Sequence, residues 1–272
     1  MNGDNSNGSF WDHLDILRAV ILKTIAVCGV FSIIAFIFKN ELFDIVLAPK
    51  SDSFITYRIL DEICRKFGVE SPENFDIQLI NTGLAQQFII HMKTALCAGV
   101  VFAAPYALYQ IFTFVSPGLY RNEREYTSRV IISGYVMFLI GTALSYFIIF
   151  PLTFQFLGTY QVDDVVVNMI SLDSYMSTLI VMCLCMGIIC ELPVISWLCA
   201  KMGFLTASFM SQYRKHAIVI ILIVAAIITP TSDIFTLMLV TVPIWLLYEI
   251  SIQIVRRIER MGISTSTITS KN

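Results

Sequence analysis

The sequence predicts an all-α integral membrane protein with six transmembrane helices and both termini in the cytoplasm. Of its 272 residues, 57% are hydrophobic and 14% are charged, whereas a soluble domain has about 25% charged residues. Apolar runs long enough to cross a bilayer also recur along almost the whole chain. One soluble core could not bury that much apolar surface, so we treat residues 1–272 as a single membrane domain.

The expected spans are residues 19–38, 88–113, 129–157, 174–200, 216–229 and 234–255. A cytoplasmic segment (1–18) precedes them, and a tail (256–272) follows. Within a long outer loop (41–87), apolar residues recur at helical spacing from Ile55 to Phe67 and predict an amphipathic helix. The last two helices should be short. The wholly apolar stretch 217–228 covers about 18 Å, and the next run, 234–248, covers about 22 Å, against a hydrocarbon core of about 30 Å.

The positive charges of the short loops predict the orientation, because cytoplasmic loops are enriched in Lys and Arg. The short loops on the other side contain no Lys or Arg, and the long loop 41–87 is a weak guide because long loops translocate largely regardless of charge. The residues that fall on one side are Arg18, Lys23, Arg121, Arg124, Arg129, Lys201, Arg214, Lys215, Arg256, Arg257 and Arg260.

The polar turn from Phe114 to Glu125 is the most distinctive stretch of the chain. It concentrates Pro117, Gly118 and Glu123, with two arginines, between two long apolar segments. Pro and Gly fix turns, and a carboxylate at the membrane edge can bind a guanidinium group through a bidentate pair. We interpret the turn as a cytoplasmic recognition loop. The alternative is that Glu123 only pairs with a neighbouring arginine.

Three carboxylates lie within or beside the apolar spans. Glu191 is the most informative, because an acidic residue inside a span is costly in lipid and usually marks function. Pro193 is expected to open the helix beside it, and a buried hydrogen bond to a neighbouring helix is the alternative role. Asp233 precedes an apolar run and is expected to cap the sixth helix. Glu249 is expected to pair with an arginine of the tail, Arg256.

Several short motifs follow one another between about Phe10 and Arg257. They are His13-Leu14 with Leu17-Arg18, Phe114 with Ser116-Pro117-Gly118-Leu119-Tyr120 and Glu123-Arg124, Phe150-Pro151, Glu191 with Pro193, Tyr213-Arg214, Thr229-Pro230 with Ser232-Asp233, and Pro243 with Tyr248-Glu249. In this order they resemble the TatC family, the multi-spanning subunit of the twin-arginine protein translocase. This resemblance implies a concave, glove-like bundle in the bacterial cytoplasmic (inner) membrane.

The resemblance also implies a function without cofactor or bond-making chemistry. The expected partners are twin-arginine signal peptides of folded substrates, TatA/TatB-type single-span proteins, the lipid bilayer and further copies of this chain within a larger complex. No nucleic acid is expected. The signal-binding residues implied are Glu123, Phe114, Leu119, Tyr120, Arg18 and Asp15. Partner-contact or intramembrane polar roles are implied for Glu191, Asp233 and Glu249, and structural roles for Pro117, Gly118, Pro151 and Pro193.

One departure from the family pattern affects the N-terminal motif. The family places an acidic residue just before the Leu-Arg pair, where this chain has Ile16, and the nearest acid is Asp15. Successive residues are about 100° apart around a helix, so either the local backbone lets Asp15 replace that acid or Glu123 acts with other help, such as Glu125.

An ion-coupled secondary transporter is the alternative function, because Glu191 is membrane-embedded. No inverted repeat or pair of broken helices supports it. An intramembrane enzyme is disfavoured, because no His-Glu-x-x-His or Gly-x-Ser-x-Gly motif is present. Six of the seven cysteines lie in apolar segments, where they are expected to act as small packing residues rather than a disulfide framework.

Overall fold

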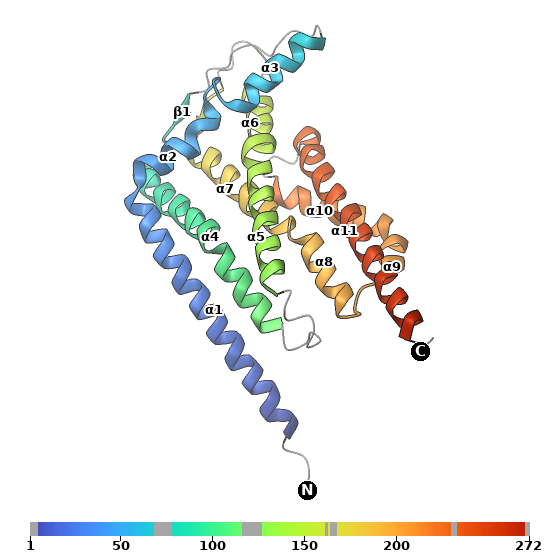
Figure 1. Ribbon diagram of the computed structural model, residues 1–272. Helices are drawn as coiled ribbons and strands as arrows, with labels where there is room; N and C mark the ends of the chain where they lie inside the picture. Colours follow the sequence, from blue (N-terminus) through green and yellow to red (C-terminus); the bar gives the residue numbers. More distant parts are fainter. Residues whose placement is uncertain are drawn as a thin grey trace.

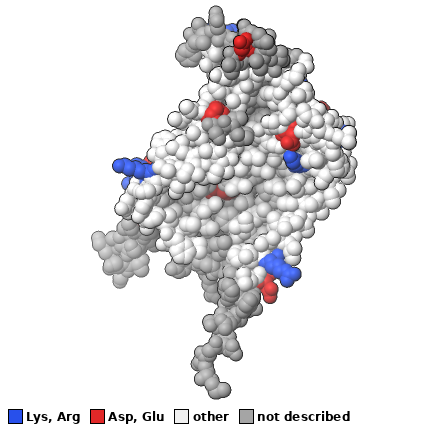
Figure 2. All heavy atoms as spheres, turned by 180° about the vertical axis from the view of Figure 1, so that it is seen from behind, with Lys and Arg blue, Asp and Glu red and all other residues white. Residues whose placement is uncertain are grey.

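The computed structural model describes the chain except for residues 1–4, 68–77, 116–126, 161–162, 164–167, 230–232 and 270–272. The described residues are almost entirely helical and form a bundle (Figure 1). α1 begins and α11 ends at the lower end of Figure 1, which we call the proximal end. The opposite end, where α2 and α3 lie, is the distal end. Figure 2 shows a broad face on which Lys, Arg, Asp and Glu are sparse, as expected for a surface in contact with lipid.

Five helical segments of the described chain are long and apolar enough to span a membrane. They coincide with five of the six predicted spans. These segments are Leu14–Ile37, Gln86–Phe114, Val130–Thr159, Leu172–Lys201 and Ile234–Arg260. The helices that form them are α1 (Asn5–Ile37), α4 (Gln86–Val115), α5 with α6 (Thr127–Leu144 and Phe150–Thr159), α7 with α8 (Leu172–Ile189 and Leu192–Lys201) and α11 (Ile234–Thr269).

The remaining predicted span, 216–229, forms α10 (Arg214–Ile228), which has only 15 residues. The last helix, in contrast, is not short, so the prediction of two short final helices is wrong for α11. This helix has 36 residues, because the polar sequence beyond Tyr248 continues it. Its continuation is stabilised by packing, since Ile252 and Val255 are fully buried against the short helix α9 (Ala207–Gln212).

Small residues allow close approach of neighbouring helices. α1 packs along α4, where Gly99 faces Ser32 and the backbone carbonyl of Cys28 (Figure 1). α5 packs on α7 at Gly141. The main core lies between these helices and α10 and α11, and its most deeply buried large side chains include Phe150, Ile90, Met176, Met182, Met186 and Ile244.

The long loop forms the distal end. It contains α2 (Lys39–Leu47), a 3-10 turn (Ala48–Lys50) and α3 (Ile55–Phe67), so the amphipathic helix expected between Ile55 and Phe67 is confirmed. Two short strands, β1 (Leu79–Ile80) and β2 (Ile170–Ser171), pair in parallel and join this loop to the one before α7. Phe54 and Tyr57 bury their rings in the core and attach the loop to the bundle.

Proline chemistry explains one attachment of the distal loop. Pro151 has no N–H and cannot donate to the carbonyl of Phe147, four residues earlier. The helix is a π-turn at Ser145–Ile149, just before this proline. The hydroxyl of Thr56, on α3, donates to the carbonyl of Phe147. A side chain from the loop therefore satisfies the acceptor that Pro151 leaves without its helical donor.

Three tyrosines attach the loop through their hydroxyls. Tyr146 donates to the carbonyl of Ile45 at 2.6 Å, and Tyr175 donates to that of Val46 at 3.1 Å. These carbonyls lie in the last turn of α2, where helices leave acceptors unsatisfied. The buried Tyr57 hydroxyl lies 3.0 Å from the carbonyl of Pro49 and 3.2 Å from that of Pro151. The tyrosines thus cap α2 and join the loop to the bundle.

Tyr57→Phe is expected to lower the free energy of unfolding by about 1–3 kcal/mol, because buried carbonyls lose their donor. Burial, with a smaller effect of Asp52, raises the pKa of Tyr57. Its contribution is therefore complete below the unfolded pKa of about 10, begins to fall as pH rises above that value, and is lost as pH passes through the higher folded pKa. Unfolding in detergent measured from pH 8 to 11 checks both effects. Tyr160→Phe is the control, since that side chain is exposed. Equal stability of both variants would contradict the assignment.

Candidate functional site

Glu191 lies at the break between α7 and α8. α7 ends at Ile189 and α8 begins at Leu192, with Glu191 at the N-cap position. Pro193 follows in the first turn of α8, and its missing N–H leaves the carbonyl of Ile189 without its usual helical donor. The interruption therefore comes from the proline, and it places a carboxylate at a helix end inside an apolar segment.

The carboxylate of Glu191 is buried against Gly134 of α5. Only 7% of the residue is exposed, and within the described chain its Oε1 has no hydrogen-bond partner. A Cβ added to Gly134 of α5 would lie 3.1 Å from Oε2 of Glu191 and 3.4 Å from a methyl group of Leu108 on α4. A glycine thus leaves room for the carboxylate. Buried polar groups are normally paired, so Oε1 of Glu191 is an unusual buried acceptor that no described residue uses.

The N-terminal motif lies level with the end of α4. Gly99 faces Cys28 and Ser32, and α1 and α4 run in opposite directions (Figure 1). Both helices rise 1.5 Å per residue, so Phe114, about 15 residues beyond Gly99, comes level with the residues near Asp15. Phe114 is half-buried. The structure therefore brings the N-terminal motif to the start of the loop that follows Phe114.

The structure shows the geometry of the N-terminal motif around Ile16. α1 is one uninterrupted helix from Asn5 to Ile37, so Asp15 lies about 100° around the helix from Ile16. Asp15, Ile16 and Arg18 are all exposed. The helix shows no local change of the backbone at this position. Asp15 is nevertheless accessible at the same end of α1.

Most residues of the predicted recognition loop are not among those that the structure describes. Pro117, Gly118, Leu119, Tyr120 and Glu123 lie outside the described residues. Their roles stay predictions, and the described residues limit only where the loop starts and ends.

The two other carboxylates have partners within the chain. Asp233 accepts a hydrogen bond from the backbone N–H of Thr236 at 2.7 Å, so it caps α11 as expected. Glu249 pairs with Arg214, with 2.5 Å between Oε1 and Nη2. The expectation that it pairs with Arg256 of its own helix is therefore not what the structure shows. The pair that forms joins α11 to the start of α10.

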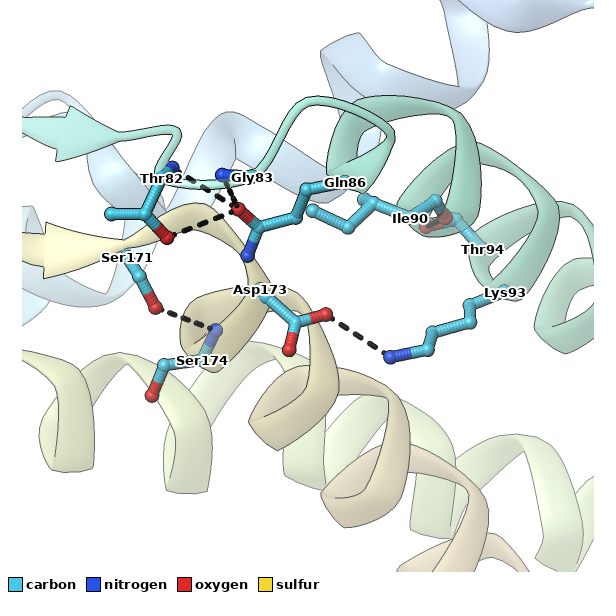
Figure 3. A network of polar contacts seen from close by, with 9 residues as sticks. All are labelled: Thr82, Gly83, Gln86, Ile90, Lys93, Thr94, Ser171, Asp173 and Ser174. Carbon is cyan, nitrogen blue, oxygen red and sulfur yellow. Dashed lines mark hydrogen bonds and ion pairs between the residues drawn. The ribbon is translucent and has the colours of Figure 1, made fainter.

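Sequence reasoning missed a charge pair near the distal end. Lys93 of α4 donates to Oδ1 of Asp173, in the first turn of α7, at 3.0 Å (Figure 3). The sequence does show a lysine one or two turns inside one apolar span and an aspartate at the start of another. No local sequence pattern, however, indicates that these two residues pair. Among the described residues, no group of His, Cys, Asp and Glu could hold a metal ion.

Comparison with known proteins supports one family. Residues 12–243 match the model of the Sec-independent protein translocase protein TatC. A TatC of Desulforapulum autotrophicum is 34% identical over 93% of this chain and 86% of its own length. A Blattabacterium TatC is 30% identical over 93% of this chain and 97% of its own length. A crystal structure of the twin-arginine translocase receptor TatC superimposes with a TM-score of 0.74 at 29% identity, covering 91% of this chain and 99% of that one.

Proposed function

Because this chain belongs to the TatC family of Sec-independent protein translocase proteins, we propose that it is the subunit that binds twin-arginine signal peptides. The protein is a multi-pass, non-enzymatic transport protein and a core component of the twin-arginine translocase. This assignment replaces the alternative of an ion-coupled secondary transporter. The proposal extends it to the step at which cargo is recognised.

The position of the N-terminal motif is the observation that carries the proposal. Asp15 and Arg18 lie level with Phe114, where the recognition loop begins. A twin-arginine signal presents two guanidinium groups, and each can form a bidentate pair with a carboxylate. Glu123 is the proposed primary carboxylate. Asp15 is a second acid at the same end of α1, and Arg18 orients these acidic groups.

The remaining loop residues complete the proposed site. Phe114 and Leu119 provide apolar surface for the hydrophobic residues that follow the two arginines. Tyr120 packs on the signal or donates a hydrogen bond. Pro117 and Gly118 restrict the turn that presents Glu123. A loop at the membrane edge is partly desolvated, which strengthens these charge pairs relative to bulk water.

Glu191 serves a later step in this proposal. Its Oε1, an acceptor that no described residue uses, lies near Gly134 of α5 at the α7–α8 break, so it suits a polar group on the helix of a single-span TatA/TatB-type partner or on an inserted signal. The complex contains several copies of this chain. With α10 as the short fifth span, the chain crosses the bacterial inner membrane six times, so both termini lie on one side. The Lys and Arg of the short loops indicate that this side, which also contains the recognition loop, is the cytoplasm.

Photocrosslinking from position 123 tests the proposal. A photoreactive residue at Glu123 is expected to crosslink to a twin-arginine signal peptide, because the peptide arginines contact this position. A twin-lysine peptide is the control, since an ammonium group cannot form the bidentate pair. Equal crosslinking of both peptides, or none from protein that retains its thermal unfolding transition, would move recognition away from this loop.

A further inference from the structure

Two apolar grooves lie on either side of α4 near the distal end. One, of about 560 Å³, lies between α1 and α4 and is lined by Phe36, Phe88 and Met92, among others. The other, of about 370 Å³, lies between α4 and α7 and is lined by Val100 and Ile180, among others. Lys93 and Leu96 line both grooves, so these two residues form the ridge that separates them.

A pair of opposite charges lies where the grooves meet. The ammonium of Lys93 is 3.0 Å from Oδ1 of Asp173, and the two side chains are 46% and 40% exposed. Side chains on a helix point toward its N-terminus, so Lys93 extends toward the distal end, where Figure 3 shows it reaching Asp173. Each charged group keeps capacity for a second partner, since an ammonium has three donors and a carboxylate about four acceptor positions.

The polar residues around this pair hold its two helices in place. Oε1 of Gln86, in the first turn of α4, accepts hydrogen bonds from the backbone N–H groups of Thr82 and Gly83 (Figure 3). The hydroxyl of Ser171 accepts from the backbone N–H of Ser174 and caps α7. The strands β1 and β2 join the segments that precede these two helices. The spacing of the two charges is therefore set before anything binds.

We propose that the Lys93–Asp173 pair and the two grooves bind one phospholipid with a zwitterionic, primary-amine headgroup. The lipid phosphate contacts Lys93, its ammonium contacts Asp173, and one acyl chain enters each groove on either side of Leu96. The neutral charge pair complements a neutral headgroup better than an anionic one. Both groove volumes fall within the range of about 300–1,000 Å³ of small-molecule sites.

The choice of headgroup follows from hydrogen bonding. A primary ammonium can donate to the carboxylate of Asp173, whereas the quaternary ammonium of a choline headgroup has no hydrogen to donate. A glycerol headgroup has no ammonium group to donate to the carboxylate of Asp173. The site therefore distinguishes three lipids that carry identical acyl chains.

Lipid binding to the purified full-length protein tests this proposal. Phosphatidylethanolamine, phosphatidylcholine and phosphatidylglycerol with the same chains are added in mild detergent, and bound lipid is measured by native mass spectrometry. Phosphatidylethanolamine is expected to bind about tenfold more tightly than phosphatidylcholine, the effect of one charge-assisted hydrogen bond. Equal affinities for the three lipids in the unmodified protein would overturn the proposal, whatever the variants do.

Variants then assign the roles of the two charges. Lys93→Gln is expected to weaken phosphatidylethanolamine binding about tenfold, and Asp173→Asn to abolish the preference over phosphatidylglycerol. Leu96→Trp narrows both grooves and should weaken all three lipids. Lys66→Gln is the matched control, because it breaks an exposed pair with Glu62 on α3, away from the grooves. Unchanged binding in Lys93→Gln, or an equal loss in Lys66→Gln, would contradict the assignment.

Discussion

Glu191→Ala is expected to reduce export of twin-arginine cargo about ten- to hundredfold while the protein still accumulates in the membrane. The buried carboxylate has an acceptor, Oε1, that no described residue uses. In the role proposed for Glu191, its removal takes a hydrogen bond from the partner helix. Leaving a buried donor unpaired costs about 1–3 kcal/mol, which corresponds to the expected range. Export rate and co-purification of single-span partners measure the effect.

Signal-peptide binding should stay unchanged in Glu191→Ala, and this distinguishes the role of Glu191 from signal recognition. Crosslinking of the signal peptide to position 123 should persist in Glu191→Ala, because the loop and this carboxylate belong to different steps of the proposal. Glu191→Gln retains the shape and one acceptor oxygen, so it should retain more export than alanine. Loss of signal contact together with normal partner assembly would reverse the assignment.

Gly141→Leu is expected to destabilise the bundle by about 3 kcal/mol or more, the upper part of the range for overpacked cores. Even a Cβ at this position would lie 2.5 Å from the backbone carbonyl of Met186 and 2.6 Å from the sulfur of Cys190. A backbone carbonyl in α7 cannot turn aside as a side chain can. The added side chain must therefore push α5 away from α7, and thermal unfolding in detergent should report a lower transition temperature.

Gly29→Ala on α1 is the matched control for this prediction. A Cβ there meets nothing within 4 Å, and alanine favours a helix over glycine by about 1 kcal/mol. The control should leave stability unchanged or raise it slightly. If Gly141→Leu were as stable as the unmodified protein, the close α5–α7 contact could not be present in the membrane protein.

Local sequence signals predicted the parts of this protein that depend on local physics. Hydrophobic runs located the five long spans, because each must match the thickness of the bilayer. Helical spacing from Ile55 to Phe67 located α3, and Asp233 before an apolar run predicted the cap of α11. The length of α11 was misjudged, because its polar end is held by packing of Ile252 and Val255 on α9, a contact between segments distant in the sequence.

The sequence by itself thus determined the membrane class, the positions of the long spans and the motifs of the TatC family. The tertiary structure alone decided which polar groups meet: Glu249 with Arg214, Lys93 with Asp173, and Thr56 with the carbonyl of Phe147. The physical reason is that burial of a polar group is costly unless it is paired. The partner of such a group is determined by helix packing between segments that are tens of residues apart, and a local sequence pattern cannot predict that packing.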